Sequence, residues 1–133
     1  VRDIVVFGLG ETYLLAAEAC HLLGDNKKAA EYINVIRKRA ALPGKEKEME
    51  ITADRINIDF ILDERAREMA GEFCRWYDLK RTGKLYERMN NPDMNEIVAG
   101  KFQEYHVLRP IPRDQLTRIS NPEDFPQNEG YGN

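Results

Sequence analysis

The sequence contains few of the residues from which catalytic and metal sites are usually built. Two histidines and two cysteines occur in 133 residues. His21 and His106 are far apart in the sequence, and on a helix Cys20 and His21 would point about 100° apart. The sequence also has no phosphate-binding glycine loop, no GxSxG turn and no cluster with metal-ligand spacing. We therefore expect no catalytic residue, no cofactor and no metal site.

Cysteine is too scarce to form a disulfide framework. Cys20 and Cys74 do not form a CxxC motif, and one possible pair does not identify the redox compartment. Isolated cysteines of this kind commonly behave as small buried hydrophobic residues. The sequence therefore predicts two free thiols.

Long apolar runs and an excess of positive charge are missing as well. No segment approaches the roughly 18 apolar residues of a membrane-spanning helix. The net charge is −3 and the pI about 5.5, whereas a nucleic-acid-binding protein needs clustered basic residues. We expect no nucleic-acid partner. Val1 is followed by Arg2 and Asp3 without a basic region ahead of a cleavage site, so the mature N-terminus is expected upstream.

Residues 9–41 show the pattern of a helical hairpin. An apolar stripe at helical spacing is followed by Gly24, which suits a helix C-terminus, and by Asp25 or Asn26, which suits the next N-cap. The spacing is similar to that of one tetratricopeptide unit. The two predicted stripes comprise Leu9, Tyr13, Ala16, Cys20 and Leu23, and then Ala29, Ile33, Ile36 and Ala40.

Residues 54–90 predict further helices, the first of them capped by Thr52 or Asp54. Arg65 falls in the middle of the apolar face of this helix, where an unpaired charge would be costly. We expect a buried ion pair, with Glu18 or Asp78 as the acid. The apolar face comprises Ile58, Ile61, Leu62 and Met69, while Glu64 is expected to point elsewhere.

Several acids between Glu64 and Asp78 could suggest a glycoside hydrolase, which needs two carboxyl groups about 5 to 10 Å apart. Arginines are interleaved with these acids at i, i+3 and i, i+4 spacing. This spacing favours ionised, ion-paired carboxylates over a protonated general acid, so the chain is not expected to be an enzyme. The ion-pair candidates are Glu18, Arg65, Arg75 and Asp78.

Residues 91–133 lack helical periodicity and predict an irregular C-terminal tail. Pro110 and Pro112 favour extended backbone before them, and such a tail is ordered only when it is pinned to the body of the protein. The segment between Glu87 and Tyr105 is the candidate ligand loop. Four aromatic side chains could stack on sugar rings, namely Trp76, Tyr77, Phe102 and Tyr105. For Trp76 and Tyr77, packing against the helical body is the favoured role.

The order of several motifs resembles the SusD/RagB family. The motifs are ETYLLAAEA, LGDNKKAAEYINVIRKRA, ILDERAREMAGEFCRWYDLKRTGKL, HVLRPIP and QNEGY, and the resemblance extends from about Glu11 to Tyr131. It implies an all-α fold with tetratricopeptide-like helical pairs, of which residues 1–133 would form the C-terminal segment. It also implies a non-catalytic outer-membrane lipoprotein that binds glycans or other nutrients and covers a SusC-like TonB-dependent transporter, with the lipid anchor on a missing N-terminal part.

The sequence departs from the family pattern at four places. Gly8 stands where an arginine is expected, which would remove an internal ion pair. Phe73-Cys74 replaces a Gly-His type pair, and Arg109 occupies a position before the PIP motif where an aromatic residue is common. Glu129 replaces the proline of a QNPGY motif.

The alternative interpretation is a cytoplasmic tetratricopeptide-type scaffold that binds a peptide in its helical groove. Such a scaffold needs several repeats to bury its helix faces, and only one unit is visible in this sequence. It also gives no role to the HVLRPIP and QNEGY motifs. Binding of oligosaccharides rather than peptides would distinguish the two interpretations.

Overall fold

The computed structural model describes residues 8–132, and within this range it contains α-helices and 3-10 helices but no strand. The prediction of an all-α fold is confirmed. Within the same range, no helix is long and apolar enough to cross a membrane. The α-helices are α1 (Leu9–Leu22), α2 (Asn26–Ala40), α3 (Ile58–Glu68), α4 (Arg75–Arg81), α5 (Leu85–Asn90) and α6 (Arg113–Leu116), and the 3-10 helices are η1 (Glu46–Met49), η2 (Ala53–Arg55), η3 (Glu104–Val107) and η4 (Pro122–Asp124).

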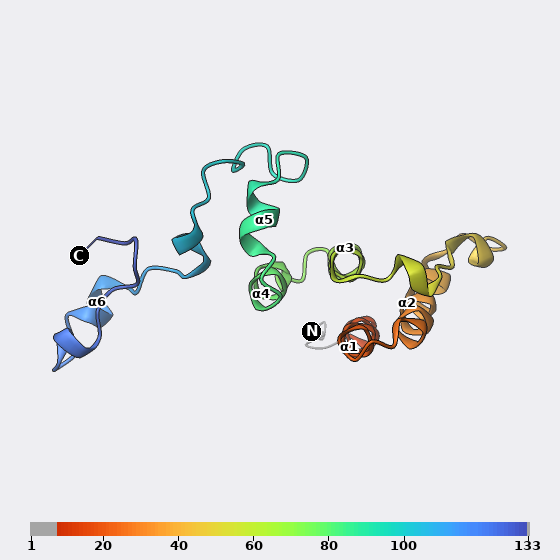
Figure 1. The fold of residues 1–133 in the computed structure, drawn as a ribbon, viewed down its shortest axis with the longest axis horizontal. Helices are drawn as coiled ribbons and strands as arrows, with labels where there is room; N and C mark the ends of the chain where they lie inside the picture. Colours follow the sequence, from red (N-terminus) through yellow and green to blue (C-terminus); the bar gives the residue numbers. More distant parts are fainter. Residues whose placement is uncertain (1–7, 133) are drawn as a thin grey trace, which may run out of the picture. The chain divides into compact units, whose positions relative to one another are not determined.

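The chain divides into two compact units, Val1–Asp78 and Leu79–Asn133, with the division inside α4. In the first unit, α1 and α2 form the expected hairpin and pack side by side (Figure 1). Gly24 makes the turn with φ +83°, a conformation that glycine adopts without steric cost. The Asp25 side chain then caps α2 by accepting a hydrogen bond from the Lys28 N–H at 2.9 Å.

The core of the first unit lies among α1, α2 and α3. The second predicted stripe is largely confirmed, since Ala29, Ile33 and Ile36 are buried, although Ala40 is exposed. The first predicted stripe is partly wrong. Its two terminal residues, Leu9 and Leu23, are exposed, and the buried face of the helix is rotated away from the predicted one. That buried face comprises Leu14, Ala17 and Glu18.

Helix α1 carries apolar side chains around its whole circumference, which explains this error. The buried face packs on α2 and α3, but leucines also occupy the opposite face. Helical periodicity identifies apolar stripes, and it does not reveal which of two stripes packs against the neighbouring helices. The outward leucines are Leu9, Leu15, Leu22 and Leu23, of which Leu23 is 85% exposed.

The connection from α2 to α3 is held by polar side chains of α2. Asn34 forms two hydrogen bonds with the backbone of Ile51, donating to its carbonyl and accepting from its N–H, both at 2.9 Å. The predicted cap of α3 is wrong: Ala53–Arg55 forms the separate η2 turn, and α3 begins at Ile58. The Asn57 side chain caps it, accepting from the Phe60 N–H at 2.8 Å.

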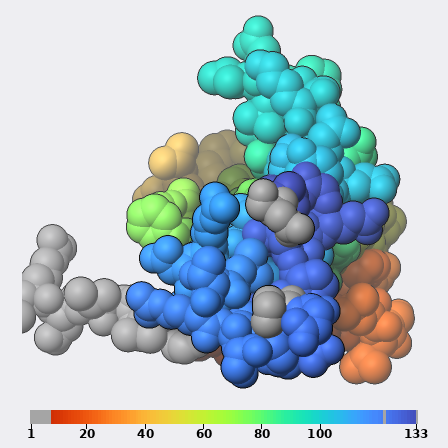
Figure 2. Space-filling view, turned by 90° about the vertical axis from the view of Figure 1, so that its left-hand side faces the viewer, coloured from red at the N-terminus to blue at the C-terminus, as the bar shows by residue number. Residues whose placement is uncertain are grey.

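The second unit is built from short helices and a tail that folds back on itself. The Asn90 side chain at the end of α5 donates to the Phe102 carbonyl at 2.8 Å and accepts from the Gly100 N–H at 3.0 Å, so it closes the intervening loop. Residues after η3 run extended through Pro110 and Pro112 before α6, as predicted. Figure 2 shows the last residues lying against the blue segment that precedes them.

The returning tail is fastened by the QNEGY motif, residues 127–131. The Gln127 amide pairs with the backbone of Ile111, accepting from its N–H at 2.8 Å and donating to its carbonyl at 2.9 Å. Asn128 donates to the Arg109 carbonyl at 2.7 Å, and the Tyr131 hydroxyl donates to the Leu108 carbonyl at 2.8 Å. These four bonds, which we call the tail clamp, fix the tail to residues 108–111.

Candidate functional site

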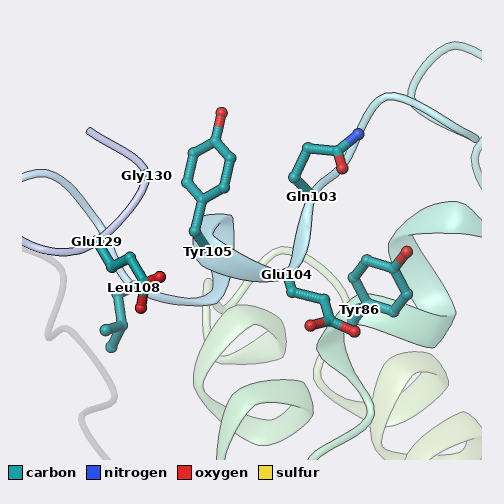
Figure 3. Close-up of a pocket in the computed structure, with 7 residues that line it drawn as sticks. All are labelled: Tyr86, Gln103, Glu104, Tyr105, Leu108, Glu129 and Gly130. Carbon is teal, nitrogen blue, oxygen red and sulfur yellow. The ribbon is translucent and has the colours of Figure 1, made fainter. Parts of the chain in front are cut away.

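One cavity of the second unit has a volume of about 640 Å³ and is open to solvent. Its walls come from α5, from residues 103–108 around η3, and from the tail (Figure 3). This volume is in the range of pockets that hold small organic ligands. The side chains at its wall are Tyr86, Gln103, Glu104, Tyr105, Leu108 and Glu129, together with the backbone of Gly130.

The tail clamp determines where the tail meets this cavity. Glu129 and Gly130 lie between clamp residues, so the clamp positions both at the cavity wall. Gly130 has φ +87°, and a Cβ atom at this position would lie 2.2 Å from Cγ of Tyr105. Only glycine combines this backbone conformation with so close an approach to the ring. The QNEGY motif therefore supplies both the hydrogen bonds of the tail clamp and the glycine that the cavity wall requires.

A continuous row of aromatic rings supports the cavity. Its ring centroids are 6.5 Å apart between Tyr86 and Phe102, and 5.2 Å between Phe102 and His106. The row continues from His106 to Tyr105 at 4.2 Å, and Tyr131 meets Tyr105 edge-on at 5.1 Å. Separations of this size give favourable aromatic contacts beyond simple burial. The wall is thus held by rings that brace one another.

The two tyrosines of the wall present different groups to solvent. Tyr86 is 41% exposed and contacts only one ring of the row, so much of its ring is accessible. Tyr105 is packed between its neighbours, and Figure 3 shows its hydroxyl pointing outward. Tyr86 is therefore suited to stacking, and Tyr105 to hydrogen bonding through its hydroxyl.

Two carboxylates at the wall are not engaged by cations. Glu104 and Glu129 are exposed, and neither forms an ion pair with any residue that the structure describes. In Figure 3 the Glu104 side chain points toward Tyr86. An ionised carboxylate accepts hydrogen bonds and cannot donate them. The cavity therefore combines an aromatic ring with acceptors, an arrangement that suits a ligand bearing hydroxyl groups.

The predicted ion-pair residues lie in the first unit, away from this cavity in the sequence. Arg65 is 2% exposed, and its Nε donates to Oδ2 of Asp78 at 2.8 Å. A second nitrogen of the same guanidinium lies 3.4 Å from Oε1 of Glu11. Glu18 is buried on α1, and Arg75 donates to the Leu62 carbonyl at 2.6 Å. These groups tie α3 to α1 and α4.

Two acids of α3, Glu64 and Glu68, are also engaged by arginines. Glu64 was expected to point away from the core, but it is 5% exposed and accepts hydrogen bonds from Arg37 and Arg67. Glu68 accepts from Arg39 at 2.7 Å. Arginine partners stabilise the ionised form of a carboxylate, whereas a general acid must be protonated. The arrangement therefore favours structural roles for these acids.

The described residues form no metal site, and the two cysteines show no sign of a reactive thiol. Residues 8–132 contain no group of three His, Cys, Asp or Glu side chains placed to hold a metal ion. Cys20 and Cys74 are free thiols, each half-buried. Burial raises the pKa of the Cys74 thiol above its ordinary value, and the neighbouring Asp78 carboxylate acts in the same direction. A raised pKa makes a thiol less reactive as a nucleophile.

The four aromatic residues predicted from the sequence lie at different places in the structure. Tyr105 lines the cavity, whereas Phe102 is 8% exposed and supports the wall from behind. Trp76 is half-buried and Tyr77 is exposed, and both belong to α4 rather than to the cavity. Sequence reasoning missed Tyr86, although the candidate loop from residue 87 begins next to it. The departure at Glu129 was noted in the sequence, but its place at the cavity became visible only through the tail clamp.

Comparison with known proteins identifies the family. The model of the SusD family matches residues 2–131. Among curated proteins of Formosa agariphila, SusD-like protein P25 is 36% identical over 131 residues, covering 96% of this chain and 24% of that protein, and SusD-like protein P2 is 34% identical over 126 residues, covering 91% and 24%. The chain thus spans about a quarter of the length of these relatives. No solved structure matches it significantly. The chain belongs to the SusD family.

Proposed function

We propose that this chain is part of an outer-membrane surface protein that binds glycans without modifying them. Its cavity would take part in ligand binding, with the Tyr86 ring stacking on a sugar and the Glu104 and Glu129 carboxylates accepting hydrogen bonds from hydroxyl groups. The observation that carries the proposal is the presence of an accessible ring and unpaired acceptors around one cavity, in a chain that belongs to the SusD family.

The proposed mechanism is capture and release. The protein holds an oligosaccharide at the cell surface and passes it to a SusC-like TonB-dependent transporter, the partner that membership of the family suggests. Residues 1–133 would form the C-terminal segment of this protein, and a lipid anchor would lie on another part. Glu64 and Glu68 of α3 accept hydrogen bonds from arginines, and this structural engagement supports a binding role over hydrolysis.

Isothermal titration calorimetry tests the proposal. The chain is titrated with neutral oligosaccharides, namely cellohexaose, mannohexaose and maltohexaose, and in parallel with unstructured peptides. We expect saturable heat with at least one oligosaccharide, and we expect Tyr86→Ala to weaken that binding. Tyr77→Ala is the matched control, since Tyr77 is exposed but lies outside the cavity. Binding of peptides but not oligosaccharides would favour the tetratricopeptide-type scaffold instead.

A further inference from the structure

The cavity wall carries charge of only one sign. Glu104 and Glu129 are its ionisable acids, and no lysine, arginine or histidine is among the described residues that line it. The cation closest in sequence to Leu108 is Arg109, which is not a lining residue. A ligand that enters the cavity therefore meets two carboxylates and no cation among the described residues that line it.

The backbone that carries these two carboxylates is held in place by hydrogen bonds. Glu129 lies inside the tail clamp, between Asn128 and Tyr131, both of which donate to backbone carbonyls of residues 108–111. Glu104 opens η3, and the Gln103 N–H before it donates to Nδ1 of His106 at 2.8 Å. The backbone at both positions is thus held, which keeps the two side chains at the cavity wall.

We propose that Glu104 and Glu129 make this cavity select uncharged or cationic saccharides and reject anionic ones, such as uronate-containing or sulfated chains. The inference rests on the proposed function, because it concerns ligand choice at the same cavity. Like charges that approach within several ångströms repel, and at a solvent-exposed wall each carboxylate should weaken binding of an anionic ligand on the order of fivefold at low salt. Neutral sugars avoid this penalty and gain acceptors for their hydroxyl groups.

A glycan array probed with the chain at low salt tests the proposal. The array carries neutral, amino, uronate and sulfated oligosaccharides, including the matched pair mannohexaose and β-1,4-linked hexamannuronate, which differ only at C6. The variants are Glu104→Gln, Glu129→Gln and the double variant, which keep side-chain size while removing charge. Glu123→Gln is the control, because Glu123 is exposed and lies outside the cavity.

We expect the wild-type chain to bind neutral or amino glycans in preference to anionic ones. The double variant should raise binding of anionic glycans relative to neutral ones by more than tenfold, and added salt should reduce the difference. Binding of anionic glycans by the wild-type chain at the level of neutral ones, or an unchanged ratio in the double variant, would overturn the inference while leaving the proposed function intact. Failure to bind any glycan would overturn the proposed function and the inference with it.

Discussion

Gly130→Ala tests whether the tail packs against Tyr105 as the structure shows. The added Cβ would lie 2.2 Å from Cγ of the ring, and the backbone at this position has φ +87°. The backbone conformation costs an alanine about 1 to 2 kcal/mol, and the overlap with a packed ring adds about 1 to 3 kcal/mol. The total is about 2 to 5 kcal/mol.

This cost is comparable to what holds the tail in place. Four hydrogen bonds form the tail clamp, and each contributes about 0.5 to 1.5 kcal/mol, which gives about 2 to 6 kcal/mol in total. Gly130→Ala should therefore release the tail from residues 108–111 instead of unfolding the whole chain. The first unit should retain its stability.

Amide hydrogen exchange measured by NMR follows this release at one site. The Ile111 N–H donates to Gln127 and is protected only while the tail is docked. A loss of 2 kcal/mol corresponds to roughly a thirtyfold increase in its exchange rate. Amides in the core of α2 should exchange as before.

Substitutions at two other glycines separate the cost of the backbone conformation from the cost of the overlap with Tyr105. Gly100 has φ +76° but open space around it, so Gly100→Ala measures the backbone cost alone, and Gly132→Ala meets neither constraint. Tyr105→Ala combined with Gly130→Ala should reduce the cost of the glycine substitution toward that of Gly100→Ala. If Gly130→Ala by itself behaves like Gly100→Ala, the close approach to the Tyr105 ring is refuted.

Three further predictions concern the first unit and its boundary. Leu14→Ala should destabilise the chain by about 3 kcal/mol in urea unfolding, because Leu14 is fully buried, whereas Leu23→Ala should have almost no effect; equal effects would contradict the packing of α1. Asp78→Ala removes the closer of two acids from the buried Arg65 guanidinium, leaving Glu11 at 3.4 Å, and should cost about 3 to 5 kcal/mol, against less than about 0.5 kcal/mol for Glu87→Ala in an exposed pair; the reverse order would exclude a buried pair. Iodoacetamide should alkylate Cys74 more slowly in the folded than in the urea-unfolded chain at mildly alkaline pH, since burial raises its thiol pKa; equal rates by mass spectrometry would refute this.

Local signals in the sequence are sufficient to predict the helical hairpin. Gly24 and Asp25 end one helix and begin the next through contacts that span only a few residues, so their types predict the turn. The start of α3 was less determined, because Thr52, Asp54 and Asn57 are all capable caps. Asn57 is the residue that caps α3, and the connection leading to it is held by Asn34 at Ile51, a contact between positions distant in sequence.

The cavity could be anticipated only in part. Tyr105 was predicted as a ligand-contacting residue from its type, and the structure brings it together with Tyr86 and Glu129, which lie on either side of it in the sequence. No periodicity or turn signal joins these three segments. They meet because the tail folds back, and the side chains responsible are amides and a tyrosine hydroxyl that bind backbone groups far away in sequence.

The most direct test of glycan binding at this cavity is NMR chemical-shift mapping. The isotope-labelled chain is titrated with whichever of cellohexaose, mannohexaose or maltohexaose gives heat in calorimetry, and amide shifts are followed across the backbone. The proposal predicts that the largest changes fall at residues 103–108 and at Glu129 and Gly130, and that Tyr86→Ala diminishes them. Changes confined to α1 and α2, or no change with any of the three oligosaccharides, would contradict it.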